Sequence, residues 1–103
     1  MQRVNADVMN EKQILLANLN KIHTTELGVD RIKMNLNLDT ADIVAFCKKK
    51  ITAADCLVYK QGKNYYCLSD DIRVTINAGS YTIITAHIIT MDEQVLKGVT
   101  GKL

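Results

Sequence analysis

The chain has 103 residues, of which 48% are apolar and 23% charged, and its formal net charge is +2 at pH 7. This length allows one domain with a single core, and the apolar content excludes an intrinsically disordered protein. A net charge this small does not by itself indicate a nucleic-acid-binding protein, although a locally basic face is compatible with it.

Three segments in the first half show the apolar spacing of helices. The first begins at Asn10, which is a good N-cap, and either Thr24 or Thr25 is suited to cap the second. The third begins at Asp39 or Thr40. The apolar positions of the three helices are Ile14, Leu15, Leu19 and Ile22, then Val29, Ile32 and Leu36, then Ile43, Val44, Cys47 and Ile51.

The apolar period then changes to 2, which indicates strands. The alternating segments are 56–60, 65–68, 72–76 and 80–89. They are separated by turn residues: Gly62 lies in the first turn, 69–71 form the second, and 77–79 form the third, with Gly79 at a left-handed position.

This order of elements predicts an α+β fold, in which three N-terminal helices pack on one face of a four-stranded antiparallel meander. We expect residues 1–9 to be a loose lead-in, 10–90 to be a single α+β domain and 91–103 to be a C-terminal tail. Residues 92–97 in that tail are expected to form one short helical turn.

The hairpin 72–89 contains His87, the better placed of two histidines. A three-residue turn at 77–79 leaves the helix-facing side apolar except for Thr82, and it places His87 beside Arg73 on the opposite, open face. A two-residue turn at Ala78-Gly79 would shift the pairing by one residue and direct His87 toward the helices. We prefer the longer turn. The predicted site on the open face comprises His87 and Arg73 as catalytic candidates and Tyr81, Thr85, Thr75, Lys60 and Tyr65 as binding candidates, with Cys67 on the same face.

These residue types have chemistry suited to RNA. Imidazole exchanges a proton near neutral pH, arginine holds a phosphate through two hydrogen bonds, and tyrosine stacks on bases. Each also has a simpler interpretation, because Thr and Tyr are common in sheets, Arg73 is explained equally well by solvation, and a single strand histidine is more often structural than catalytic. His23, at a helix boundary, is interpreted as a capping or surface residue.

Motifs for cofactors and metals are absent from the sequence. It contains no GxGxxG, P-loop, HExxH or GxSxG pattern, and Cys47, Cys56 and Cys67 lack the spacing of a zinc site. We therefore expect no metal and no nucleotide cofactor, with the cysteines buried and reduced. With no signal peptide and no apolar run long enough to cross a bilayer, we expect a cytoplasmic protein with no membrane partner.

Three segments carry a resemblance to a known family: KIHTTELGVDRIKMNLNL (21–38), YKQGKNYYC (59–67) and SYTIITAHII (80–89). They resemble a small bacterial family known as domain of unknown function 3781, over roughly residues 12–90. This resemblance implies no activity.

The layout of helices followed by a meander is also similar to that of barnase-like and RelE-like endoribonucleases, which cleave RNA on an open sheet face. That similarity implies His87 as general acid or base, Arg73 as phosphate clamp, and Thr85 and Tyr81 as orienting groups. The sequence departs from barnase because none of the predicted strands has a carboxylate to serve as its base.

Two functions are therefore expected. The preferred one is an interaction module whose open face binds a protein partner or a second copy, because Ile83 and Ile89 are expected on that face. The alternative is an RNA-binding or RNA-cleaving domain. A metabolic enzyme ranks third because no cofactor motif is found.

Overall fold

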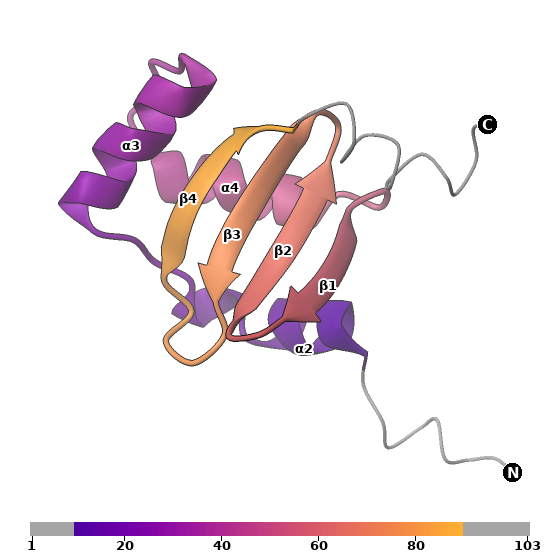
Figure 1. Cartoon of the computed structure of the whole chain (residues 1–103). Helices are drawn as coiled ribbons and strands as arrows, with labels where there is room; N and C mark the ends of the chain where they lie inside the picture. Colours follow the sequence, from indigo (N-terminus) through magenta and orange to yellow (C-terminus); the bar gives the residue numbers. More distant parts are fainter. Residues whose placement is uncertain (1–9, 90–103) are drawn as a thin grey trace, which may run out of the picture.

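The computed structural model describes residues 10–89, with the helices first along the chain and the strands after them (Figure 1). The helical elements are α2 (Glu11–Ala17), the 3-10 helix η1 (Leu19–Lys21), α3 (Glu26–Leu36) and α4 (Ile43–Ile51). The strands are β1 (Leu57–Gln61), β2 (Asn64–Ser69), β3 (Ile72–Asn77) and β4 (Ile83–Ile88). For these residues the predicted α+β class, with helices N-terminal to an antiparallel sheet, is confirmed.

Side-chain caps fix the starts of the first two helices. Asn10 accepts a hydrogen bond from the Gln13 amide at 2.8 Å, and the Gln13 side chain accepts one from the Asn10 amide at 2.9 Å, which is a capping box. Thr25 accepts a bond from the amide of Gly28 at 3.0 Å and caps α3. Both starts agree with the sequence prediction.

The other helix boundaries differ from the prediction. The first predicted helix is divided at Asn18, whose side chain donates to the carbonyl of Ile14 at 2.8 Å and competes with the continuing helix. Helix α4 begins after Asp42, which accepts a bond from the Ala45 amide at 2.9 Å. The predicted caps at 39 and 40 are therefore wrong by a few residues, because the cap that is used is the one closest to the apolar stripe.

Within the described residues, the strands form one antiparallel sheet in the order β1-β2-β3-β4. Side chains of directly paired residues lie on the same face of such a sheet. One face contains the cross-strand row Cys67, Val74 and Ala86 and packs against the helices. We call it the covered face, and Figure 1 shows α2 and α4 behind it and α3 beside β4. The opposite side is the open face.

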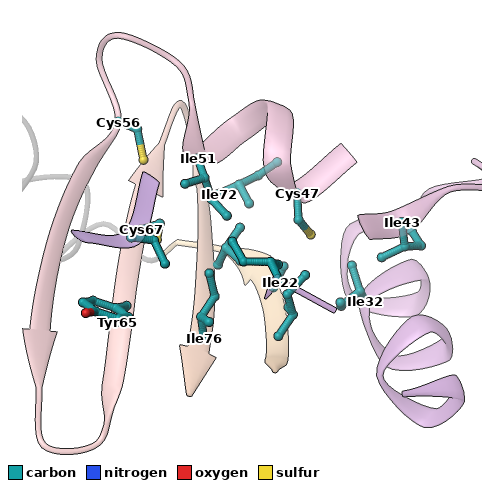
Figure 2. Packing of buried hydrophobic residues seen from close by; sticks show 14 of the residues in the cluster. Ile22, Ile32, Ile43, Cys47, Ile51, Cys56, Tyr65, Cys67, Ile72 and Ile76 are labelled. Atoms are coloured by element: carbon teal, nitrogen blue, oxygen red, sulfur yellow. The ribbon is translucent and has the colours of Figure 1, made fainter. Parts of the chain in front are cut away.

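The hydrophobic core lies between the helices and the covered face (Figure 2). Its buried members from the helices are Leu15, Ile32, Leu36, Ile43, Cys47 and Ile51. Those from the connecting segments and strands are Ile22, Cys56, Tyr65, Cys67, Ile72, Val74, Ile76, Ile83 and Ala86. Burial of each large aliphatic side chain contributes about 1.5–3 kcal/mol, so this layer holds the helices to the sheet.

The turn between β2 and β3 decides which side chains of β1 and β2 face the helices. Ser69 pairs with Ile72, so the turn has only two residues, Asp70 and Asp71. Asp70 has a φ of 57°, in the left-handed region that aspartate tolerates. The predicted turn, 69–71, is one residue longer, and a change of one residue moves every side chain of β2 to the other face.

The loop between β3 and β4 also differs from the prediction. The amide of Tyr81 donates to the carbonyl of Asn77 at 2.8 Å and closes a loop that consists of residues 78–81. The Asn77 side-chain oxygen accepts bonds from the amides of Gly79 and Ser80, both at 2.9 Å. Tyr81, with a φ of 60°, takes the left-handed position that the sequence assigned to Gly79.

A β-bulge follows this loop. Thr75 pairs with Thr85, whereas the next residue, Ile76, pairs with Ile83, so Ile84 is the extra residue on β4. From Thr85 onward, each side chain of β4 therefore lies on the face that the sequence predicted. Before Thr85, each side chain lies on the opposite face from the predicted one.

The bulge determines which predicted faces are correct. Arg73 pairs with His87, and both lie on the open face, as predicted. Ile83 lies on the covered face and is 1% exposed, and Ile89 is 3% exposed, so the expectation of two exposed isoleucines on the open face is wrong.

The outer edge of β4 is closed by the segment that precedes α3. The Ile83 amide donates to the carbonyl of His23 at 2.7 Å, and the Thr24 hydroxyl donates to the carbonyl of Ile83 at 2.8 Å. Nε2 of His23 lies 3.1 Å from the hydroxyl of Thr82. His23 is exposed and has a structural role at this edge.

Several parts of the sequence prediction fall outside residues 10–89, namely the lead-in 1–9, the tail 91–103 and the helical turn 92–97. No helix in the described part of the chain has the length and apolar character needed to span a membrane.

Candidate functional site on the open face

Two rows of side chains cross all four strands on the open face. One row is Leu57, Leu68, Arg73 and His87, and the next is Tyr59, Tyr66, Thr75 and Thr85. The four strands contain no aspartate or glutamate. In these two rows the strands therefore supply two leucines together with rings, hydroxyls, a guanidinium and an imidazole, and no carboxylate.

Tyr59, Tyr66 and Arg73 form a stack on this face. The ring centroids of Tyr59 and Tyr66 are 5.3 Å apart and their planes differ by 25°. The Arg73 Cζ atom lies 5.5 Å from the Tyr66 centroid, which is within the range of a cation–π contact. Cross-strand pairing on β1 and β2 explains the ring stack, and the diagonal position on β3 explains the guanidinium. We call Tyr59, Tyr66, Arg73 and His87 the aromatic–cationic strip.

His87 lies at the β4 end of this strip, directly opposite Arg73. Partial burial lowers the pKa of His87 below its ordinary value, and the positive charge of Arg73 lowers it further. The imidazole is therefore neutral at pH 7, with one nitrogen able to accept a proton or a hydrogen bond.

The two threonines predicted as binding residues lie on the open face but differ in exposure. Thr75 is 6% exposed, which leaves little of its side chain for a ligand. Thr85 is half-buried, and its hydroxyl accepts a hydrogen bond from Asn35 Nδ2 at 3.1 Å. Leu68, in the row of Arg73, is fully buried. The residues of the strip are each half-buried, whereas Thr75 and Leu68 beside them are buried.

Three other predicted site residues lie on the covered face, so their expected position beside Arg73 is wrong. Tyr65 is 5% exposed in the core, and Lys60 is its partner on β1. Tyr81 stacks on Tyr65, with ring centroids 6.4 Å apart, and the Lys21 ammonium lies 5.8 Å from its centroid. The two-residue turn before β3 moves Tyr65 and Lys60, and the longer loop before β4 moves Tyr81.

The cysteines have no reactive character. All three are buried and none forms a disulfide, and Cys67 lies on the covered face, contrary to the prediction. Burial raises the pKa of Cys47 to about 12, and a hydrogen bond with Cys56, together with burial, raises that of Cys67. Protonated thiols are poor nucleophiles and poor metal ligands. Among residues 10–89, no group of three His, Cys, Asp or Glu side chains is placed to hold a metal ion.

Two residues of the strip, Tyr59 and Tyr66, were missed by the sequence prediction. The segment YKQGKNYYC did contain the signal, because a tight turn at Gly62-Lys63 pairs Tyr59 with Tyr66 whichever face they occupy. The pairing of the two rings was therefore predictable. The face of the sheet on which they lie was not, because it depends on the length of the turn before β3.

A shallow depression lies at the hairpin end of the sheet. It has a volume of about 330 Å³ and is lined by Lys60, Gly62, Lys63, Asn77, Ala78 and Gly79. The amide of Ala78 donates to the carbonyl of Lys63 at 2.8 Å, which joins the two hairpin tips. The two lysines make this end of the sheet basic.

A family model described as "Protein of unknown function (DUF3781)" matches residues 16–87, which is more than half of the chain. The match includes the whole strip. No curated protein and no solved structure matches the chain. The expected similarity to barnase-like and RelE-like endoribonucleases is therefore not shown by these comparisons.

Proposed function

The chain belongs to the DUF3781 family, and we propose that it is a binding module that holds single-stranded RNA on the open face of its sheet. The observation that carries this proposal is the stack of Tyr59, Tyr66 and Arg73. Unpaired bases stack on tyrosine rings and on guanidinium planes, and arginine also holds phosphate through paired hydrogen bonds.

The distribution of charge supports an anionic ligand on this face. Arg73 and His87 lie on this face, and Lys63 lies in the turn between β1 and β2, toward the other end of the strands. A strand of RNA that follows the β-strands would meet basic groups at both ends and tyrosine rings between them. The strands supply no carboxylate that would repel its phosphates.

A protein partner or a second copy on this face has less support. That hypothesis depended on exposed isoleucines, and Ile83 and Ile89 are 1% and 3% exposed. Apart from the half-buried Leu57, the side chains that remain accessible in the two open-face rows are aromatic, cationic and polar, which suits nucleobases better than apolar association.

RNA cleavage is a second candidate because a neutral His87 lies opposite Arg73. The imidazole would accept the proton of an attacking hydroxyl while the guanidinium held the phosphate. Such a reaction also needs an acid for the leaving oxygen. The strands offer no carboxylate, and His23 is occupied at the edge of β4, so we propose binding without cleavage.

The test is fluorescence anisotropy with a labelled single-stranded RNA at low salt. We expect Tyr66→Leu to weaken binding by roughly 5- to 100-fold, because one base loses its stacking partner. Tyr66→Phe keeps the ring and should bind nearly as well as the wild-type protein. Equal losses for both variants, with the fold retained by circular dichroism, would show that the ring does not contact a base.

Charge specificity is tested by a matched pair of variants. Arg73→Gln should weaken binding and reduce the salt dependence by about one phosphate contact, whereas Lys49→Gln, on the exposed side of α4, should have no effect. Absence of any RNA binding at low salt, or equal effects of both variants, would contradict the proposal. End-labelled RNA that is cut by the wild-type protein and not by His87→Ala would establish cleavage instead.

A further inference from the structure

The outer side of α3 has two exposed apolar side chains whose position the core does not explain. Leu27 is 65% exposed and Met34 is 78% exposed. They are seven residues apart and therefore point in nearly the same direction from the helix. The exposed residues Asp30 and Arg31 lie between them, one on each side of the line that joins them. We call these four residues the α3 outer stripe.

This stripe faces away from the rest of the described chain. The buried residues of α3 are Gly28, Ile32 and Leu36, on the opposite side of the helix. Figure 1 shows α3 beside β4, at the margin of the molecule. Within residues 10–89, neither Asp30 nor Arg31 takes part in an ion pair. The stripe is therefore a narrow apolar line with one charge of each sign at its centre.

We propose that the α3 outer stripe is the contact through which two copies of this chain associate, with their α3 helices parallel. A two-fold axis that runs along the helices brings Leu27 against the partner's Leu27 and Met34 against the partner's Met34. These layers are about 10 Å apart along the axis. The same symmetry places each Asp30 beside the partner's Arg31, so the dimer gains two ion pairs between them.

The charges select the relative direction of the two helices. In an antiparallel pair, the flank that carries Asp30 would face the partner's Asp30, and the flank that carries Arg31 would face the partner's Arg31. Like charges would then meet on both sides of the apolar line, which opposes association. In the parallel pair every charge meets its opposite. A second copy of this chain is therefore a complementary partner for the stripe.

The size of the stripe limits the strength of this dimer. Helix α3 has 11 residues, and one helix face is smaller than the roughly 1,200–2,000 Å² buried in stable complexes. We therefore expect a reversible dimer with a dissociation constant on the order of 100 µM. The contact uses none of the residues of the aromatic–cationic strip, and it is tested without RNA.

Sedimentation velocity over a dilution series, without RNA, is the first test. The wild-type protein should change from dimer to monomer on dilution, and Met34→Glu should weaken the dimer by at least about tenfold. Ile88→Glu, which changes an apolar side chain that is 55% exposed outside the stripe, should not. A protein that stays monomeric at about 1 mM, or a dimer that Met34→Glu leaves intact, would overturn the proposal.

Reversing the charges of Asp30 and Arg31 gives a second test. Association that is lost in each variant and restored in their mixture cannot result from loss of folding. Asp30→Arg alone and Arg31→Asp alone each create like-charged contacts and should be monomeric. An equimolar mixture of the two variants restores both ion pairs and should form a heterodimer at least as strong as the wild-type dimer. If the mixture does not associate more strongly than either variant alone, Asp30 and Arg31 are not contact residues and the proposal fails.

The direction of the helices is tested by cross-linking. Under oxidation, Met34→Cys should form a disulfide with a second copy of the same variant, whereas Lys49→Cys should not. The native thiols are buried and do not interfere. Efficient linking only between Leu27→Cys and Met34→Cys would indicate antiparallel helices and would overturn the parallel arrangement.

Discussion

Tyr65 and Tyr66 are adjacent residues of the same type with opposite environments. Tyr65 points into the core, where it is 5% exposed, while Tyr66 stacks between Tyr59 and the Arg73 guanidinium on the open face. A similar contrast holds for the central strands, because the covered face has the apolar row Cys67, Val74 and Ala86, whereas the open face has Tyr66, Arg73 and His87. Residue type alone therefore does not show which tyrosine is on the open face. The position of each residue relative to the turns does.

The largest expected difference between the two faces is in chemical accessibility. The thiols of Cys47, Cys56 and Cys67 are buried, so a thiol reagent should modify them about a thousandfold more slowly in the native protein than in urea. The surface variant Lys49→Cys is the control, because its added thiol is exposed outside the proposed dimer contact and should react immediately. Rapid modification of a native cysteine would mean that the covered face opens to solvent.

Truncation should also separate the faces by stability. Ile76→Ala on the covered face should lower the free energy of unfolding by about 2–5 kcal/mol, since it leaves a cavity in the core. Thr85→Ala on the open face removes one exposed hydrogen bond and should cost about 1 kcal/mol or less. Urea unfolding measures both. Equal losses would show that the open face is packed as tightly as the covered one.

Gly28 offers a smaller test, at the junction of α3 and the sheet edge. A Cβ atom added at Gly28 would contact the Thr24 hydroxyl, which donates to the carbonyl of Ile83. We expect Gly28→Ala to destabilise the protein by about 1 kcal/mol, although alanine favours helices. With Thr24→Ala present the contact is absent, and the same substitution should raise stability. Thermal unfolding of the four proteins gives the sign of each effect, and stabilisation by Gly28→Ala alone would contradict the contact.

The smallest expected effect is the pH dependence that His87 adds to the open face. Because its pKa is lowered in the folded state, protonation favours the unfolded chain. The stabilisation that neutral His87 contributes to the folded state is complete above the ordinary histidine pKa, near 6.5. It is lost as the pH falls below that value. Stability should therefore decrease more between about pH 7 and pH 5 for the wild-type protein than for His87→Gln. An NMR titration that gives His87 an ordinary or raised pKa would contradict this.

The bulk of the fold was predictable from the sequence because its signals are local. Asn10 and Thr25 cap helices as predicted, and the change of apolar period at residue 56 separates helices from strands correctly. The shared face of Arg73 and His87 was also predicted. This prediction is correct because the longer loop shifts the strand pairing by one residue and the bulge shifts it back. The last residues of β4 therefore lie on their predicted faces.

What the sequence did not reveal is the length of the turns. Asp70 and Tyr81 take left-handed conformations without being glycine, and the sequence has no strong signal for that choice. The capping of the last loop by the Asn77 side chain is equally inconspicuous. A turn that is one residue longer or shorter moves every side chain of the adjoining strand to the other face. This is why Tyr66, and not Tyr65, lies at the candidate site.

The closed edge of β4 limits how this protein can polymerise. Backbone and side-chain groups of His23 and Thr24 already bond to Ile83 there, so an incoming strand finds its hydrogen-bonding positions occupied. Among the described residues, β1 is therefore the edge strand to which a further strand can add. A continuous intermolecular β-sheet needs two exposed edge strands in each molecule. Because one edge of this sheet is closed, two copies can pair through β1, but no third copy can be added.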